Sequence, residues 1–263
     1  MKYRLIAADM DGTLLNDYGE VSEDVRRAID AAKAQGLVFT LSTGRPMLGV
    51  EPYLDLIDGD LPVITCNGAL IMTARTKRII SKSEISRAAA NSIIQRGIDE
   101  GAIVAAWAGE KLYSSVTDSS YSSFYKSITG METVDISQLP NSGITKVLYI
   151  MPPEKIKYFQ KNFLPPKGVQ SKASGSMFLE FFSDKAGKDI ALRFLAEHLG
   201  IDMSETFAIG DNYNDLEMLR SAGLGVAMGN APEDIKKAAD FVTTGNNEDG
   251  VALAIEKFIL NGR

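Results

Sequence analysis

Two aspartates, Asp9 and Asp11, stand at the end of an apolar segment near the beginning of the chain, in the sequence LIAADMDGT. Side chains alternate along an extended strand, so residues two positions apart project to the same side. Two carboxylates at one place repel each other, and the pKa of one of them rises until a proton or a cation resolves the conflict. The spacing therefore predicts a shared proton or a bound cation at this position.

Two further apolar segments also end in polar residues. Ser42 and Thr43 follow LVFTL, and Asp211 follows TFAIG. In doubly wound parallel sheets, ligands bind beyond the carboxyl ends of the strands, and these residues would meet there. A cluster of Asp9, Asp11 and Asp211 offers only oxygen ligands, and such a cluster predicts Mg²⁺.

Phosphoryl transfer is the chemistry that such a cluster favours. One aspartate can attack phosphorus and form a covalent intermediate while its neighbour transfers protons. The transferring group needs donors and positive charge, which Thr43, the N–H of Gly44 before a helix start, and Lys188 can supply. Ser42 competes with Thr43, because adjacent strand side chains point to opposite sides. Lys185 competes with Lys188, which we favour because it precedes the IAL pattern of the next helix.

The elements that would position these residues alternate between strands and helices. In the first third, Ser22 can cap a helix that ends at Gly36, between the strands YRLIAA and LVFTLS. Helical spacing follows at 48–57, then a strand LPVITC, and Asn67-Gly68 predicts a hairpin turn before ALIM. The final third repeats the alternation, with the strands TFAIGD, LGVAM and FVTT and the helices KDIALRFLAEHLG, NDLEMLRSAG and APEDIKKAA before a closing helix.

The middle of the chain has a different pattern, typical of an antiparallel sheet. A helix is expected in AAANSIIQRGIDE and another after Pro152-Pro153, with strands in AIVAAW, KLYSS and ITKVLYIM and a hairpin turning at Ser174-Gly175. Five aromatic residues of this segment are expected in a core or interface: Trp107, Tyr113, Tyr121, Phe124 and Tyr125. The sequence thus predicts an α/β protein, in which a doubly wound parallel Rossmann-like core of residues 1–83 and 185–263 carries an inserted α+β domain, residues 84–184.

The overall composition excludes several classes of function. The net charge is -6 with both signs interspersed, which argues against nucleic acid and anionic membrane surfaces as partners. The apolar runs are shorter than the roughly 18 residues of a membrane span, so we expect a cytoplasmic protein. Cys66 is the only cysteine and His198, near a helix end, the only histidine, which excludes an internal disulfide and argues against a histidine-rich zinc site. The sequence carries no signal for a particular oligomeric state.

Four segments occur in the order DMDGTLLN, LSTGRP, KDIAL and GDNYNDLEML, followed by GVAMGNAPEDIKKAAD and NEDGVA. Together they resemble the motifs of the haloacid dehalogenase-like hydrolases, in the Cof-type branch with an inserted C2 cap. The inserted segment matches the cap by position and length rather than by motif. The chain departs from the family at Asp189, where a glycine often follows the motif lysine.

The resemblance implies a Mg²⁺-dependent phosphatase with Asp9 as nucleophile and Asp11 as acid and base. It implies that Mg²⁺ is held by Asp9, by Asp211 and by the backbone carbonyl of Asp11. Asp215 would orient these ligands without contacting the ion itself. Thr43 and Lys188 would take part in catalysis, and the implied substrate-binding or phosphate-binding set is Asp11, Gly12, Thr43, Gly44, Arg45, Lys188 and Asn214.

The implied substrates are small phosphorylated metabolites, above all sugar phosphates, with pyridoxal phosphate and FMN as further candidates. The insert would act as a lid that limits entry and excludes water. Two alternatives use the same residues. A phosphomutase would return the phosphoryl group to its substrate, and a binding protein would hold a phosphorylated ligand without turnover.

Overall fold

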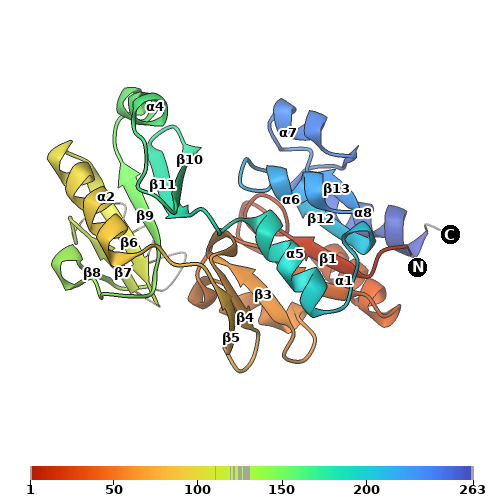
Figure 1. Ribbon diagram of the computed structural model, residues 1–263. Coiled ribbons are helices and arrows are strands. Elements are labelled where there is room, and N and C mark those ends of the chain that lie inside the picture. Colours follow the sequence, from red (N-terminus) through yellow and green to blue (C-terminus); the bar gives the residue numbers. More distant parts are fainter. Residues whose placement is uncertain are drawn as a thin grey trace. The chain divides into compact units, whose positions relative to one another are not determined.

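The computed structural model describes residues 2–109, 111–118, 120, 122–123, 126 and 131–261. The chain forms two compact units, each drawn in Figure 1. Unit 1 comprises Met1–Gly44, Pro52–Ser81 and Gly187–Arg263, and unit 2 comprises Arg45–Glu51 and Lys82–Ala186. Unit 2 therefore includes a short segment from the first part of the chain as well as the long insertion.

The core of unit 1 is a parallel sheet with the strand order β14-β13-β12-β1-β2. Its strands are β1 (Leu5–Ala8), β2 (Val38–Leu41), β12 (Thr206–Gly210), β13 (Leu224–Ala227) and β14 (Phe241–Val242). All residues of β1, β12 and β13 are buried. Burial on both faces explains why these strands are continuous apolar runs in the sequence.

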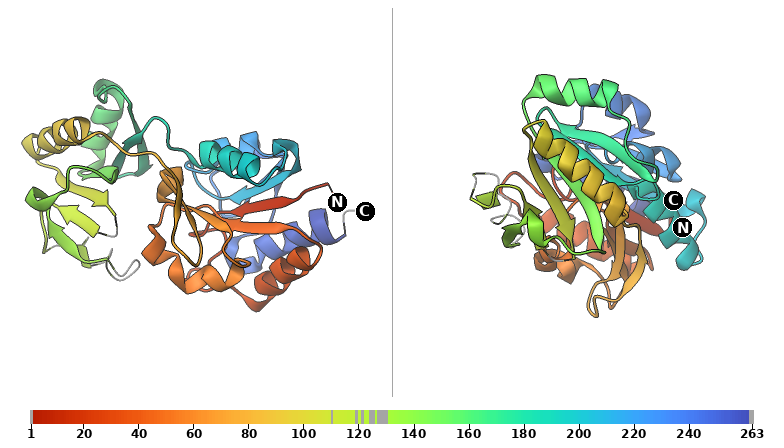
Figure 2. Two further views of the ribbon diagram at one scale, coloured as in Figure 1. Left: turned by 60° about the horizontal axis from the view of Figure 1, so that its bottom comes forward. Right: turned by 60° about the vertical axis from the view of Figure 1, so that its left-hand side comes forward.

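Helices cover both faces of this sheet. Leu5, Ala7 and Ala208 pack in one cluster with α5, α6 and α7, and Figure 2 shows α1 and α8 on the face opposite α5. The side chain of Ser22 accepts a hydrogen bond from Val25 N at the start of α1, as predicted for a helix cap. The helices are α1 (Glu23–Ala34), α5 (Lys188–His198), α6 (Leu216–Ser221), α7 (Glu233–Ala238) and α8 (Gly250–Ile255), which continues as a π-helical turn, η7 (Glu256–Leu260). Unit 1 also contains the 3₁₀ turns η5 (Met203–Glu205) and η6 (Asn246–Glu248).

A small antiparallel sheet adjoins the parallel one. Its strands are β3 (Pro62–Thr65), β4 (Leu70–Thr73) and β5 (Ile79–Lys82), and a parallel bridge between Ser42 and Ile64 links β3 to the end of β2. The predicted hairpin after β3 is confirmed, but its connection is a 3₁₀ turn, η3 (Cys66–Gly68), rather than a two-residue turn. The helix expected at 48–57 is wrong. Two 3₁₀ segments stand there, η1 (Met47–Gly49) and η2 (Glu51–Leu56), because Pro52 cannot donate the N–H of a continuous α-helix.

Unit 2 has a six-stranded sheet with the order β10-β11-β9-β6-β7-β8. Its strands are β6 (Ile103–Ala108), β7 (Lys111–Ser114), β8 (Thr133–Asp135), β9 (Ile144–Ile150), β10 (Val169–Gly175) and β11 (Phe178–Ser183). The helices α2 (Arg87–Asp99) and α4 (Pro153–Asn162) share one buried cluster with the sheet, and η4 (Ile136–Gln138) follows β8. The strands pair antiparallel, as expected, except that β7 and β8 are parallel.

Two details of unit 2 bear on the sequence predictions. The hairpin turn falls at Ser176 and Met177, two residues later than predicted, because a register shift after Ala173 lets β10 continue to Gly175. Trp107 and Tyr113 are buried, as expected, whereas Tyr121, Phe124 and Tyr125 lie outside the described residues. None of the helices that the structure describes combines the length and the apolar character that a membrane span requires.

Candidate active site

Asp9 and Asp211 follow neighbouring strands at one edge of the parallel sheet. Strands β1 and β12 pair with Ala8 opposite Ile209, and Asp9 N donates a hydrogen bond to the carbonyl oxygen of Ile209 over 3.0 Å. The side chain of Asp9 is buried, and that of Asp211 is partly buried. Parallel pairing therefore brings together two carboxylates that stand near opposite ends of the sequence.

Lys188, the first residue of α5, lies between two of the carboxylates. Its Nζ donates to Asp9 Oδ1 over 2.5 Å and to Asp215 Oδ1 over 2.6 Å. Lys188 is 1 % exposed and Asp215 is fully buried. An ionic group at such a depth requires a charged partner, so the three side chains stabilise one another in place.

The cluster retains more negative charge than Lys188 neutralises. Burial raises the pKa of Asp9 well above its ordinary value, and Asp215 and Asp211 raise it further against the opposing effect of Lys188. Burial, followed by repulsion from Asp215, raises the pKa of Asp211 to about 6. Burial disfavours the charged form of Lys188, but the carboxylates of Asp215 and Asp9 outweigh it and raise the lysine pKa. A further positive charge would therefore be stabilised here.

Asp215 uses both of its carboxylate oxygens within the protein. Oδ1 accepts from Lys188, and Oδ2 accepts from the backbone N–H groups of Asp211 at 3.2 Å and Asn212 at 3.0 Å. Its side chain does not cap α6, although it stands at the N-cap position. Asp215 thus fixes the lysine and the loop that carries Asp211, and leaves little capacity for an additional ligand.

The turn after β1 places Asp11 at the surface and Gly12 against Asp211. The side chain of Asp11 is exposed. Gly12 has φ +78°, and a Cβ at this position would lie 2.6 Å from Asp211 Oδ2. Thr13 Oγ1 donates to Asp211 Oδ1 over 3.0 Å. Both the backbone conformation and the close approach of the carboxylate therefore require a glycine.

Thr43 and Gly44 follow β2 in unit 1. Thr43 is fully buried, and its N–H donates to the carbonyl oxygen of Ile64 over 3.0 Å. A Cβ at Gly44 would lie 3.1 Å from Asn67 Oδ1. Ser42, the alternative to Thr43, is also fully buried, and its Oγ has no hydrogen-bond partner among the described residues.

Two of the residues named from the sequence belong to unit 2. Arg45 directly follows the last residue of this part of unit 1, and its Nη1 donates to the carbonyl oxygen of Gly49 over 3.2 Å. Lys185, the alternative to Lys188, precedes the return of the chain to unit 1 at Gly187. The ion pairs with Asp9 and Asp215 are made by Lys188.

Asn67 contacts two predicted site segments, although the sequence indicates only a turn. Asn214 Nδ2 donates to Asn67 Oδ1 over 3.0 Å, and Asn67 N donates to the carbonyl oxygen of Thr43 over 2.9 Å. Cys66, Asn67 and Gly68 all have positive φ, at 52°, 53° and 85°. Non-glycine residues held in this conformation are enriched at functional sites. The Asn-Gly dipeptide was the available signal, but it is equally the signature of a hairpin.

The donor set suits a hard divalent cation. One carboxylate oxygen from each of Asp9, Asp211 and Asp215 lies within 4.8 Å of the others. Because Lys188 and backbone N–H groups occupy the oxygens of Asp215, Asp9 and Asp211 are the members with free ligand capacity. The side chain of Asp11 is not part of this group; the sequence prediction assigned it a backbone carbonyl. Oxygen ligands and surplus negative charge fit Mg²⁺.

Comparisons with known proteins give one family. The family model described as haloacid dehalogenase-like hydrolase matches residues 6–255. The chain is 39% identical over 269 residues to the Bacillus subtilis protein named "Putative phosphatase YxeH", which covers 98% of this chain and 99% of that protein. It is 29% identical to the B. subtilis 5-amino-6-(5-phospho-D-ribitylamino)uracil phosphatase YwtE, with 97% and 98% covered.

A solved structure shares the fold over nearly its whole length. The structure described as the HAD subclass IIB sugar phosphatase BT4131 superposes with a TM-score of 0.82 at 26% identity, with 97% of this chain and 98% of that one covered.

Proposed function

Because the chain belongs to the haloacid dehalogenase-like hydrolases and is a phosphoric monoester hydrolase of the Cof type, we propose that it acts on small phosphomonoesters through a phosphorylated Asp9 and with Mg²⁺. The observation that carries this proposal is the buried ion cluster of Asp9, Lys188 and Asp215 beside Asp211. Aspartate can form a covalent phosphoryl intermediate, and phosphoryl transfer depends on positive charge placed around the transferring oxygens.

The reaction proceeds in two displacements. An oxygen of the Asp9 carboxylate bonds to phosphorus, the bond from phosphorus to the ester oxygen breaks, and Asp11 gives its proton to the leaving alkoxide. Asp11 then accepts a proton from water, whose oxygen attacks phosphorus, releases inorganic phosphate and restores the Asp9 carboxylate. The position of Asp11 two residues after Asp9, with an exposed side chain, supports this division of labour.

Residues of several chain segments bind the transferring phosphoryl group. Lys188 supplies its ammonium and the Thr43 hydroxyl and Gly44 N–H donate hydrogen bonds. Gly12 and Asn214 are proposed to lie around the same phosphoryl group. Gly12 lies against Asp211, and Asn214 donates a hydrogen bond to Asn67, and these contacts support that placement. Arg45 is proposed as a substrate contact from its position in the chain beside Gly44.

Mg²⁺ would be held by Asp9, by Asp211 and by the backbone carbonyl of Asp11. Asp215 would support these ligands through its hydrogen bonds to Lys188 and to the N–H of Asp211. When bound, the ion supplies positive charge that stabilises the negative charge of the transferring group. Lys188 binds one carboxylate oxygen of Asp9 and Thr13 binds one of Asp211, so each group has a second oxygen to offer as a ligand. This second oxygen and the raised pKa of both groups support the assignment.

The substrate class is proposed as phosphorylated sugars and sugar alcohols. One similar protein is a sugar phosphatase, and one relative dephosphorylates a ribityl phosphate; pyridoxal phosphate and FMN are further candidates. Unit 2 would select among them as a lid. The chain crosses between units next to proposed phosphate-binding residues, after Gly44 and just before Lys188, so a movement of unit 2 would act directly on these residues.

The test is phosphate release from a panel of small phosphomonoesters, with Mg²⁺ and with a chelator. We expect hydrolysis that stops on chelation and returns when Mg²⁺ is added. Asp9→Asn should abolish turnover without unfolding, since the amide is a poor nucleophile of the same size, whereas Asp184→Asn, an exposed change in unit 2, should retain it. Retained hydrolysis by a folded Asp9→Asn protein would refute the assignment of the nucleophile.

A further inference from the structure

Three backbone hydrogen bonds lie within the turn that carries Asp11, and one of them runs from Thr13 N to the carbonyl oxygen of Met10 over 3.2 Å. Leu15 N donates to the carbonyl oxygen of Met10 over 2.9 Å, and Leu14 N donates more weakly to that of Asp9 over 3.3 Å. The side chain of Asp11 is exposed, so packing in a core does not hold it. The backbone of the turn sets where this side chain begins, so contacts to that backbone contribute to the position of the carboxyl.

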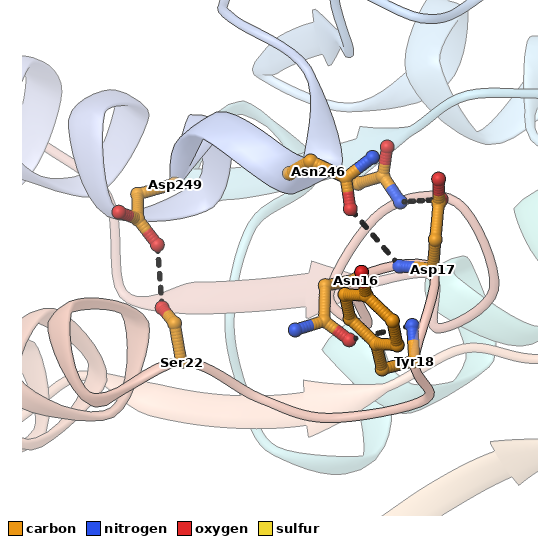
Figure 3. Close-up of a pocket in the computed structure, with 7 residues that line it drawn as sticks. Asn16, Asp17, Tyr18, Ser22, Asn246 and Asp249 are labelled. Carbon is orange, nitrogen blue, oxygen red and sulfur yellow. Dashed lines mark hydrogen bonds between the residues drawn. The ribbon is translucent and has the colours of Figure 1, made fainter.

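Two asparagines outside the proposed reaction bind this backbone from later parts of the chain. Asn230 Nδ2 donates to the carbonyl oxygen of Gly12 over 2.8 Å, and Asn246 Nδ2 donates to that of Leu15 over 3.0 Å. The two are connected, since Asn246 N donates to Asn230 Oδ1 over 3.1 Å. Asn246 Nδ2 also lies 3.2 Å from Asp17 Oδ1, and Figure 3 shows these two residues facing each other at a polar pocket.

The loops that carry the two asparagines are packed closely together. Gly229 N donates to the carbonyl oxygen of Thr244 over 2.9 Å, and a Cβ at Gly229 would lie 2.8 Å from Gly245 N. Thr243 Oγ1 donates to the carbonyl oxygen of Gly250 over 2.8 Å. These contacts hold the loop after β13 and the loop after β14 together, and Asn230 and Asn246 extend from these two loops to the turn.

We propose that Asn230 and Asn246 are positioning residues that hold the Asp11 carboxyl in line with the leaving group. The inference rests on the proposed function, in which Asp11 protonates the leaving alkoxide. An amide is needed at 230, because it donates to Gly12 and accepts from Asn246, whereas a carboxylate would set an oxygen against the Gly12 carbonyl. A displacement of about 1 Å of a reacting group can lower a rate by about 100-fold.

The experiment compares kcat/KM for two substrates that differ in their need for a proton. The anion of p-nitrophenol leaves without protonation, whereas the alkoxide of glycerol phosphate needs the acid. For Asn230→Ala, we expect kcat/KM for glycerol phosphate to fall about 10- to 100-fold, and kcat/KM for p-nitrophenyl phosphate to fall by a much smaller factor. Asn246→Ala retains the backbone N–H that donates to Asn230 Oδ1. It should therefore lower kcat/KM for glycerol phosphate by a smaller factor, again with less effect on p-nitrophenyl phosphate.

Asn247→Ala is the matched control, because Asn247 Oδ1 accepts from Asp17 N over 3.0 Å and makes no hydrogen bond to the turn of residues 9–15. It should keep the wild-type ratio of the two kcat/KM values. Far-UV circular dichroism checks folding, and Asn246→Ala decides the matter if Asn230→Ala does not fold. Equal losses for both substrates, unchanged values, or unfolding of both variants would overturn the inference. A wild-type protein inactive on both substrates with Mg²⁺ would instead overturn the proposed function, and this inference with it.

Discussion

Replacing Lys188 by methionine tests whether the buried carboxylates depend on its charge. The side chain of Lys188 is 0% exposed, and those of its partners Asp9 and Asp215 are 7% and 0% exposed. Removing one partner of a buried ion pair leaves uncompensated charge and costs about 3–5 kcal/mol. This is a large share of the roughly 5–15 kcal/mol by which a domain is stable.

The loss should depend on pH in a definite direction. Burial and neighbouring carboxylates raise the pKa of Asp9 above its value in the unfolded chain, and loss of the ammonium raises it further. A carboxyl group of this kind favours the folded state while protonated, and that contribution is lost as the pH rises through its folded pKa. Lys188→Met should therefore be destabilised more at pH 8 than at pH 5. The double variant Lys188→Met/Asp215→Asn should recover part of the loss.

Urea unfolding followed by far-UV circular dichroism measures the effect. The only tryptophan, Trp107, belongs to unit 2, so its fluorescence would not report on unit 1. Lys33→Met is the control, because Lys33 also pairs with two aspartates, Asp30 and Asp58, but these are 72% and 59% exposed. Exposed pairs contribute about 0.2–1 kcal/mol. Equal losses for the two variants, or a Lys188→Met loss that does not grow with pH, would refute the reasoning.

Three substitutions in unit 1 test other features of the structure. Gly12→Ala should cost about 1–2 kcal/mol for the left-handed backbone and should lower kcat by about 100-fold through displacement of Asp211, as measured by urea unfolding and phosphate release. Gly59→Ala, at φ +59° with no atom within 4 Å of the new Cβ, should show the loss of stability alone, and a comparable loss of activity would contradict the role of the Asp211 contact. Asp60→Ala should lower the thermal midpoint at neutral pH, because Asp60 accepts hydrogen bonds from Arg75 N and Thr76 N. The hydrogen bond from the Thr76 hydroxyl, followed by those from Thr76 N and Arg75 N, lowers the pKa of Asp60 to about 2, so the difference in thermal midpoint from wild type should shrink as the pH falls from 3.8 to 2; a difference independent of pH would contradict this.

The fold class could be predicted because buried parallel strands leave a clear pattern. The strands β1, β2 and β12 are short apolar runs, each followed directly by a polar residue, and β13 is an apolar run that ends just before Met228 and Gly229. The helices that connect these strands show apolar periodicity, and α1 also begins at a capping serine, Ser22. Strands β5 and β8 were missed. Both are short and only partly buried, so their residues show neither a continuous apolar run nor strict alternation.

The segments of the site could be predicted, but not the contacts among them. Asp9, Asp211 and Lys188 are visible from the sequence as chemical groups at element ends. The contacts of Asn67 and Asn230 are not, since an asparagine in a loop reads as a turn residue and its partners stand far away in the chain. Such contacts depend on how the loops pack at the sheet edge, which local propensity does not determine.

The sheet of unit 1 also constrains how a newly made chain can fold. Strand β1 is synthesised before unit 2, but its neighbour β12 is synthesised only after the whole of unit 2. The strands of unit 2 are all complete before α5, so its sheet can form while the parallel sheet is still half assembled. During that interval β1 presents an unpaired apolar edge, and the growing chain is most exposed to aggregation and to chaperone binding.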